Sequence, residues 1–272
     1  MPRPSRVAVA AMGVAAIVVA ALVTGGVMVG RLVDPPSPTT TVVADDGSEI
    51  VLDWADLPAD GWTDPADVLA APRADDVERV GEQQLLSLQA AVDPVAPGLR
   101  WGFEPQGGAT FEPMPVGGNG YGGTSLHQVY NSPTRTGAGL AADADWLVVA
   151  DALEAHLAEL GYGAIEWEHD REPFPHESEA ERDQEVVRQF GSLDPDEMWM
   201  WSGTATAGSM WAWVSIWDER RDTAPSEPWQ SSPSGVSLFL GGTVVAEADE
   251  QAYAEGVAPF EGLARPEPSH SD

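Results

Sequence analysis

The chain has 272 residues, with 44 acidic side chains against 13 basic ones and a formal net charge of -31. It contains no cysteine and no lysine, which excludes disulfides, thiolate nucleophiles, lysine Schiff bases and the lysine-dependent phosphate loop. Because so acidic a surface repels phosphate backbones, we expect no nucleic-acid partner.

The N-terminal segment Val7–Gly30 contains no ionisable side chain. At about 1.5 Å per residue it would extend roughly 36 Å as a helix, enough to cross a ~30 Å hydrocarbon core. Arg3 and Arg6 precede it and favour a cytoplasmic N-terminus. Residues 1–33 are therefore predicted to form a single-pass anchor in the cell membrane, with the rest of the chain extracytoplasmic. A cleaved signal peptide is the alternative interpretation.

Residues 34–66 differ in composition from the segments around them. Three prolines precede three threonines here, a composition typical of an extended, poorly packed tether. Glu49–Trp54 alternates enough to form one short strand. We expect one folded domain over residues 67–265, long enough to bury a core, followed by a frayed tail over residues 266–272.

Apolar residues recur at helical spacing in two segments, 75–92 and 145–160. In the second segment, Asp143 can cap the first turn and Gly161 suits the left-handed position after the last turn. Ser178 begins a capping-box pattern. The sequence therefore predicts two apolar-striped helices and a third, more polar one.

Tryptophans alternate with aliphatic residues in two runs, 198–201 and 210–217. A period of two predicts two strands joined by a turn, each with indoles on one side and aliphatic side chains on the other. If Trp201 pairs with Trp213, the indoles of both runs share one face of the hairpin. The tryptophans of these runs are Trp199, Trp201, Trp211, Trp213 and Trp217.

Further strands are expected around Trp101 and Phe103, near residues 165–168, and over Ser234–Leu240. Helices followed by consecutive strands with short connections indicate an α+β fold. We therefore predict a mainly antiparallel sheet with two or three helices packed against it.

The five tryptophans are the candidate ligand-binding residues. Indole faces stack on the apolar faces of pyranose rings, so an exposed row of indoles would form a platform for sugars. However, both faces of the hairpin are apolar, and the helix over residues 145–160 needs a surface to cover. We therefore expect most of these indoles to be buried between the sheet and that helix.

Five potential metal ligands crowd into one short segment, and Pro173 and Pro175 indicate that it is a loop. The ligands are His169, Asp170, Glu172, His176 and Glu177. Their spacing matches no established zinc pattern, and charge clusters of this kind usually lie in solvent. We expect neither zinc nor calcium to bind the chain.

No motif of the chain predicts a catalytic residue or a cofactor. The glycine-rich segment 117–123 lacks the lysine of a phosphate loop and is predicted to be a flexible turn. Glu166 and Glu168 could in principle serve a glycosidase. Their alternation with Ile165 and Trp167 predicts instead that both carboxylates point to solvent.

The layout of the chain resembles that of the LppA-like envelope proteins of actinobacteria. The resemblance is carried by a basic N-terminal span, a Pro/Thr tether, a helix that ends near APGLRW, and the sequence DALEAHLAELGYGAIEWE before a meander. Many proteins of that type are anchored through a lipidated cysteine, which this chain lacks. The resemblance implies a small surface-exposed α+β module with no assigned catalysis.

These features predict a membrane-anchored extracytoplasmic envelope protein that is not an enzyme. Its membrane contact is the segment 7–30, and its folded domain would bind or scaffold an envelope glycan or a protein partner. The alternative function is a glycan-binding protein, or a carboxylate-dependent glycan hydrolase, that uses the tryptophan face.

Overall fold

The computed structural model describes residues 36–44, 46–103, 113–115, 117–222 and 232–268. The chain divides into two compact units, each assembled from segments far apart in the sequence. Unit 1 consists of Met1–Gly61, Gly117–Ser125 and Gly256–Asp272, and unit 2 consists of Trp62–Val116 and Leu126–Glu255. The range 67–265, predicted as one domain, contributes segments to both units.

Unit 1 contains a hairpin where the sequence predicts a tether. Strand β1 (Thr39–Val43) pairs antiparallel with β2 (Glu49–Asp53). β2 confirms the short strand predicted over Glu49–Trp54. β1 was not predicted because the preceding prolines favour an open chain. Its β-branched threonines and valines do favour a strand.

The described core of unit 1 is a group of aromatic rings around Trp54. This residue opens a short 3-10 helix, Trp54–Asp56, and is almost fully buried. Its ring centroid lies 5.5 Å from that of Tyr121 and 5.0 Å from that of Phe260. Three distant segments are thereby joined, and the described part of residues 36–61 is folded rather than a tether.

The glycine-rich segment 117–123 is held by one buried asparagine. The Asn119 side chain is 0% exposed, and its Oδ1 accepts hydrogen bonds of 2.9 Å from the amides of Tyr121 and Gly123. Its Nδ2 donates to three carbonyl oxygens, those of Trp54, Ala55 and Leu57. The segment is therefore an ordered turn rather than the flexible one predicted.

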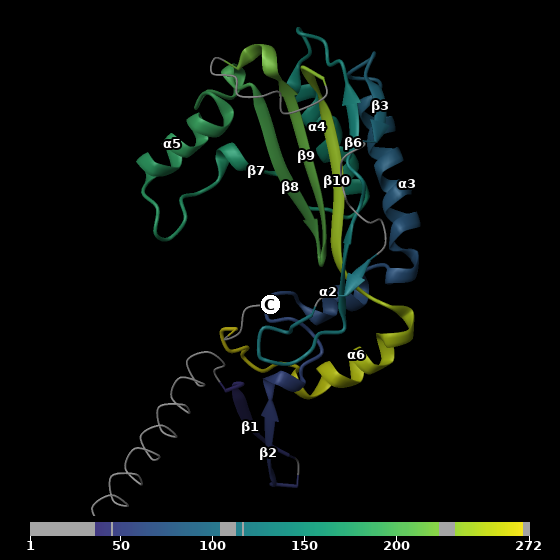
Figure 1. Cartoon of the computed structure of the whole chain (residues 1–272), viewed down its shortest axis with the longest axis vertical. Coiled ribbons are helices and arrows are strands. Elements are labelled where there is room, and N and C mark those ends of the chain that lie inside the picture. Colours follow the sequence, from purple (N-terminus) through teal and green to yellow (C-terminus); the bar gives the residue numbers. More distant parts are fainter. Residues whose placement is uncertain (1–35, 45, 104–112, 116, 223–231, 269–272) are drawn as a thin grey trace, which may run out of the picture. The chain divides into compact units, whose positions relative to one another are not determined.

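Eight strands form one antiparallel sheet in the described part of unit 2, in the order β3-β6-β10-β9-β8-β7, with β5 paired to β10 and β4 paired to β5 (Figure 1). The strands are β3 (Arg100–Phe103), β4 (Met114–Pro115), β5 (His127–Asn131), β6 (Arg135–Ala138), β7 (Glu166–Trp167), β8 (Met200–Ala207), β9 (Met210–Asp218) and β10 (Ser234–Val245). The strands pair antiparallel throughout the described part of this sheet. The predicted α+β class with a mainly antiparallel sheet is confirmed.

The predicted helices form close to their expected bounds. They are α3 (Ala74–Val92), α4 (Trp146–Glu159) and α5 (Glu179–Phe190), and the structure adds α2 (Pro65–Ala70) and α6 (Glu250–Val257). The capping box of α5 is confirmed, with Ser178 and Glu181 bonded reciprocally. The cap of α4 is Asp145 rather than Asp143, since the Asp145 carboxylate accepts from the Leu147 amide at 3.1 Å.

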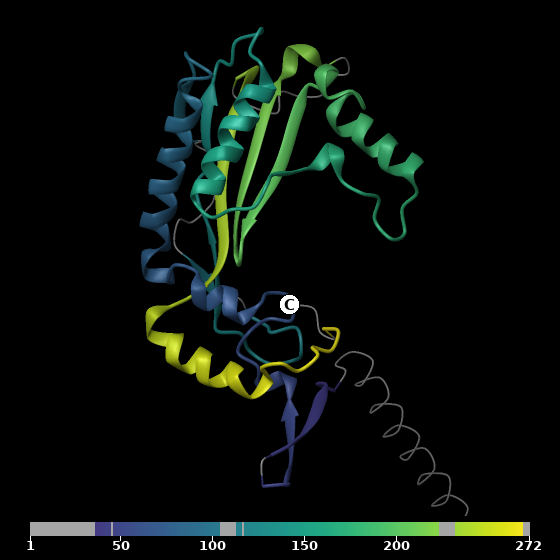
Figure 2. The same cartoon turned by 180° about the vertical axis from the view of Figure 1, so that it is seen from behind.

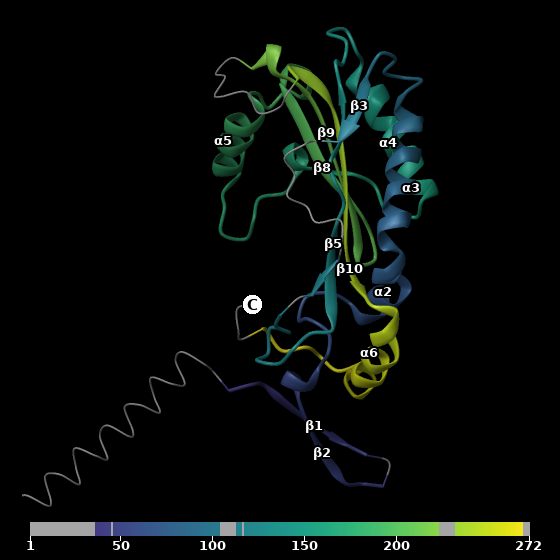
Figure 3. The ribbon, with the colours of Figure 1, turned by 45° about the vertical axis from the view of Figure 1, so that its right-hand side comes forward.

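Helices α3 and α4 lie side by side against one face of the sheet (Figures 2 and 3). Apolar side chains from both helices and from the central strands β9 and β10 are buried between them. These side chains include Val77, Leu85, Leu88, Val149, Leu153, Leu157, Ala212, Val214, Ile216, Val236, Leu238 and Leu240. Beneath the two helices, the core therefore uses the aliphatic positions of β9.

The predicted membrane anchor Val7–Gly30 lies outside the described residues. Within the residues that are described, no helix combines the length and the apolar character needed to span a membrane. The anchor therefore stays a prediction from the sequence.

Candidate functional site

The tryptophans of β8 and β9 lie on opposite faces of the sheet. Trp201 pairs with Ile216, and Trp213 pairs with Thr204. The condition under which all the indoles would share one face, a pairing of Trp201 with Trp213, is therefore not met. A two-residue turn at Gly208–Ser209 closes the hairpin between Ala207 and Met210, so every odd-numbered residue of one strand faces an even-numbered residue of the other.

Trp201 belongs to the core under the helices. Its side chain is 4% exposed, and its ring meets that of Trp146 of α4 edge-on at 5.5 Å and 87°. The ring centroid of Trp167 lies 5.7 Å from that of Trp201. The indole N–H of Trp201 donates to the Pro195 carbonyl at 3.0 Å. Burial against the helix over residues 145–160 is thus correct for this indole.

Trp217 is fully buried, but on the face of the sheet opposite α3 and α4. It pairs with Gly235 of β10, and a Cβ at Gly235 would lie 2.6 Å from the Trp217 ring. Its indole N–H donates to the Ser232 carbonyl at 3.1 Å. Glycine is needed at position 235 because the indole lies over that backbone.

Trp211 and Trp213 share the face of Trp217 but are only partly buried. Trp213 lies between Thr204 and Phe239 in the cross-strand register, and Phe239 is also partly buried. In Figure 1 no described helix lies in front of β8, β9 and β10 on this side. These positions are the most accessible part of the predicted tryptophan set on the sheet.

Polar side chains extend the row of Trp213 across the sheet. Thr204 also pairs with Glu166 of β7, so Glu166 projects from the same face. Thr206, which is exposed, pairs with Trp211. We call the set Trp211, Trp213, Phe239, Thr204, Thr206 and Glu166 the indole face. It combines two indoles and a phenyl ring with groups that can form hydrogen bonds.

A row of four hydroxyl side chains crosses the same side of the sheet, next to the row of Trp213. The register aligns Ser202, Ser215, Ser237 and Thr136 on strands β8, β9, β10 and β6. All four are buried, and the hydroxyls of Thr136 and Ser237 lie 3.1 Å apart. Among the described residues, Ser215 Oγ has no hydrogen-bond partner, which is uncommon for a buried polar atom.

Trp199, the remaining tryptophan of the predicted set, precedes β8. Its amide donates to the Phe190 carbonyl at 3.0 Å at the end of α5, and its side chain is partly buried against the core. The five indoles therefore do not share one face, and the expectation that most of them lie between the sheet and the helix over residues 145–160 is wrong. Two indoles lie on the indole face, Trp217 is buried on that side of the sheet, and Trp201 and Trp199 lie elsewhere.

The predicted ligand cluster in residues 169–177 is dispersed. His169 is buried beside the ring of Trp201, at 5.5 Å between centroids. Glu177 forms a bidentate pair with Arg171, at 2.6 and 2.8 Å, and this pairing lowers the pKa of Glu177 to about 2. His176 stacks on Phe174 instead. Over the described ranges, no group of three or more acidic or histidine side chains could hold a metal ion.

Burial lowers the pKa of His169, against the opposing effect of the Asp170 and Glu168 carboxylates. Its Nδ1 has no hydrogen-bond partner among the described atoms, and its Nε2 lies 3.8 Å from the Asp170 carboxylate. The aromatic surroundings of the ring therefore disfavour its protonated form.

Acidic pH is expected to destabilise unit 2 through His169. Because the folded pKa lies below the ordinary value of 6.5, the unfolded chain binds more protons in the interval between the two, and stability rises with pH across it. The measurement is the free energy of unfolding at about pH 5 and about pH 7.5, on either side of an unperturbed histidine pKa. The gain between them should be smaller for His169→Gln than for the unchanged chain, and an equal gain would contradict the assignment.

Glu166 and Glu168 both line a cavity of about 560 Å³ beside β7. Trp167, Arg171 and Thr204 also line it. Glu168 accepts a hydrogen bond of 3.0 Å from Gln189, whereas Glu166 projects from the indole face. The two carboxylates therefore differ in their surroundings, and the five predicted tryptophans do not line this cavity.

Phe239 and the alignment of Glu166 with Trp213 were not predicted. Both depend on which residues pair across strands, and pairing between β7, β8, β9 and β10 is set by contacts distant in the sequence. The alternation in Ser234–Leu240 was the available signal for Phe239, but it could not assign the face.

No family model matches the chain, and no curated protein matches it. Among solved structures, the crystal structure of the candidate lipoprotein LppA from Mycobacterium tuberculosis is similar to 68% of this chain and 86% of that chain. The TM-score is 0.39 and the sequence identity is 7%.

Proposed function

We propose that the chain is a membrane-anchored extracytoplasmic envelope protein, and that unit 2 is a non-enzymatic module that binds glycans on the indole face. The anchor would be Val7–Gly30, whose length and preceding arginines support this orientation. Degradation of the domain by protease added to intact cells would agree with it, and protection of the whole chain would contradict it.

The observation that carries the binding function is the partial exposure of Trp211, Trp213 and Phe239 together on one side of the sheet. Aromatic side chains that served packing alone would be expected to be covered, as Trp201 and Trp217 are. Large apolar groups left accessible together commonly mark a binding surface.

The chemistry of the indole face suits a sugar. The apolar C–H faces of a pyranose ring can stack on Trp211 and Trp213, while its hydroxyl groups need polar partners at the ring edge. Thr204, Thr206 and Glu166 supply such partners in the adjacent register positions. A hydrolase would need a second carboxylate opposite Glu166, and Glu168 is bonded to Gln189 instead.

The experiment is titration of the full chain with soluble fragments of envelope glycan, with calorimetry as the readout. Trp213→Ala is expected to weaken binding at least about tenfold, as removal of a central interface tryptophan does. Trp62→Ala is the matched control, since Trp62 is 61% exposed and lies outside the indole face. Equal affinity of both variants, or no binding by the unchanged chain, would contradict the proposal.

A further inference from the structure

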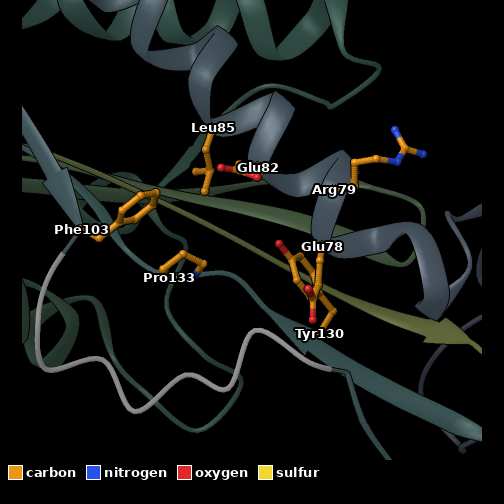
Figure 4. Close-up of a pocket in the computed structure, with 7 residues that line it drawn as sticks. All are labelled: Glu78, Arg79, Glu82, Leu85, Phe103, Tyr130 and Pro133. Atoms are coloured by element: carbon orange, nitrogen blue, oxygen red, sulfur yellow. The ribbon is translucent and has the colours of Figure 1, made fainter.

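A separate cavity of about 350 Å³ lies between α3 and the strands of unit 2 (Figure 4). It is lined by Glu78, Arg79, Glu82, Leu85, Phe103, Tyr130 and Pro133. Its size is at the lower end of the range for small-molecule sites, which is about 300–1,000 Å³. None of its residues belongs to the indole face.

A buried tyrosine hydroxyl points into this cavity. Tyr130 of β5 is 1% exposed, and Figure 4 shows its hydroxyl directed toward α3. The hydroxyl is not one of the fully enclosed polar atoms that lack a partner, and Tyr130 is one of the residues that line the cavity. Gly81 makes the position possible, because a Cβ at residue 81 would collide with the Tyr130 hydroxyl. A glycine inside a helix costs about 1 kcal/mol relative to alanine, so the close approach has a stability cost.

The Tyr130 hydroxyl remains protonated at any physiological pH. Burial raises its pKa to about 12, and the neighbouring carboxylates of Glu78 and Glu82 and the phenol of Tyr162 act in the same direction. The neutral hydroxyl can therefore both donate and accept a hydrogen bond inside the cavity.

The charge at the cavity is negative. Glu78 and Glu82 are one turn apart on α3, which places both carboxylates on one side of the helix. Arg79 does not neutralise them, because Figure 4 shows its side chain pointing away from the cavity. Its guanidinium is paired with Asp76 at 2.8 Å.

The aromatic wall of the cavity already contacts a cation at its edge. The Arg135 guanidinium lies 4.9 Å from the centroid of the Phe103 ring and is held there by Gln89. Arg135 therefore already supplies the cation for this ring, and Phe103 is left to offer apolar contact to a ligand. Leu85 and Pro133 add apolar surface to the same cavity.

We propose that this cavity binds a small organic cation, an alkylamine that carries a primary ammonium group. Glu78 and Glu82 would bind the charge, the Tyr130 oxygen would accept an ammonium N–H, and Leu85 and Phe103 would contact the alkyl chain. The two carboxylates attract any cation, while the hydroxyl favours one that donates hydrogen bonds.

The test is calorimetric titration of the full chain with cadaverine at physiological ionic strength, where long-range attraction by the net charge is screened. Saturable binding is expected, with much weaker binding of tetramethylammonium, which has no N–H, and of neutral 1,5-pentanediol. Glu78→Gln combined with Glu82→Gln should weaken cadaverine binding roughly ten- to a hundredfold, as loss of charge-assisted hydrogen bonds implies.

Two further variants separate the site from general electrostatics. Tyr130→Phe should weaken binding about fivefold, as loss of one neutral hydrogen bond does. Asp151→Asn removes one negative charge from an exposed position of α4 and should leave the affinity within about twofold.

Three outcomes would overturn the proposal. They are absence of saturable binding, equal affinity for 1,5-pentanediol, and equal weakening by Asp151→Asn. Near-ultraviolet circular dichroism of each variant checks the fold, and the Glu78/Glu82 pair decides the question if Tyr130→Phe fails to fold.

Discussion

Replacing Asn119 with aspartate is expected to lower the local stability of unit 1 by roughly 3–5 kcal/mol. The amide donates to the carbonyl oxygens of Trp54, Ala55 and Leu57. A carboxylate would have no hydrogen to offer these oxygens and would carry a buried negative charge toward them. The hydrogen bonds from the amides of Tyr121 and Gly123 would remain. The variant therefore tests the loss of the Nδ2 donor alone.

The measurement is hydrogen exchange of the Tyr121 and Gly123 amides, because both are bonded to Asn119. Faster exchange is expected in Asn119→Asp, in step with the lost stability. Thr124→Ala changes an exposed residue of the same loop and should alter stability by less than about 0.5 kcal/mol. Unchanged protection in the Asn119 variant would show that the asparagine does not hold the turn.

Replacing Trp217 with alanine is expected to destabilise unit 2 by about 3–5 kcal/mol, the usual cost of removing a buried aromatic side chain. The indole is 0% exposed, lies against Gly235 and donates a hydrogen bond to the Ser232 carbonyl. The alanine would leave a void where the indole was. Since β9 and β10 pair along nine residue positions, this void would lie beside the longest strand pairing in the described sheet.

Trp213→Ala is the matched comparison for this prediction. The residue type, strand and face are the same, but Trp213 is partly accessible, so its loss should cost less than about 2 kcal/mol. Chemical unfolding of both variants gives the two free energies. Equal destabilisation would contradict the division of the indoles into a covered and an accessible part.

Local patterns in the sequence predict α3, α4 and α5 of unit 2 well, but not the short helix α2. The capping box at Ser178 is formed as expected, and the apolar stripe of residues 145–160 becomes the buried side of α4. These signals act within one or two helical turns, so they need no knowledge of distant partners. The same is true of the alternation that predicts β8, β9 and β10.

The faces of the strands could not be predicted, because a single residue decides them. Placing the turn at Gly208–Ser209 moves Trp201 to the helix side and leaves Trp213 on the other. A turn shifted by one residue would also bury apolar residues, since indoles and aliphatic side chains alternate in both runs. The composition of the two strands therefore does not decide which set of side chains faces the helices.

Long-range contacts account for the other omissions. Asn119 is separated from Trp54 by 65 positions in the chain, and nothing in the glycine-rich segment identifies that partner. Gly81 and Tyr130 likewise meet only in the folded protein. A glycine within a predicted helix was the signal for a close approach, but it does not name the group that approaches.

The central claim is that Trp211 and Trp213 bind a glycan while Trp201 and Trp217 serve the core. The most direct measurement is the proton–nitrogen NMR spectrum of the indole N–H groups during titration of the full chain with soluble envelope glycan, with signals assigned by single Trp→Phe variants. The account predicts that the Trp211 and Trp213 signals shift with glycan concentration while those of Trp201 and Trp217 remain in place. Signals that all stay unchanged, or shifts confined to Trp201 and Trp217, would contradict it.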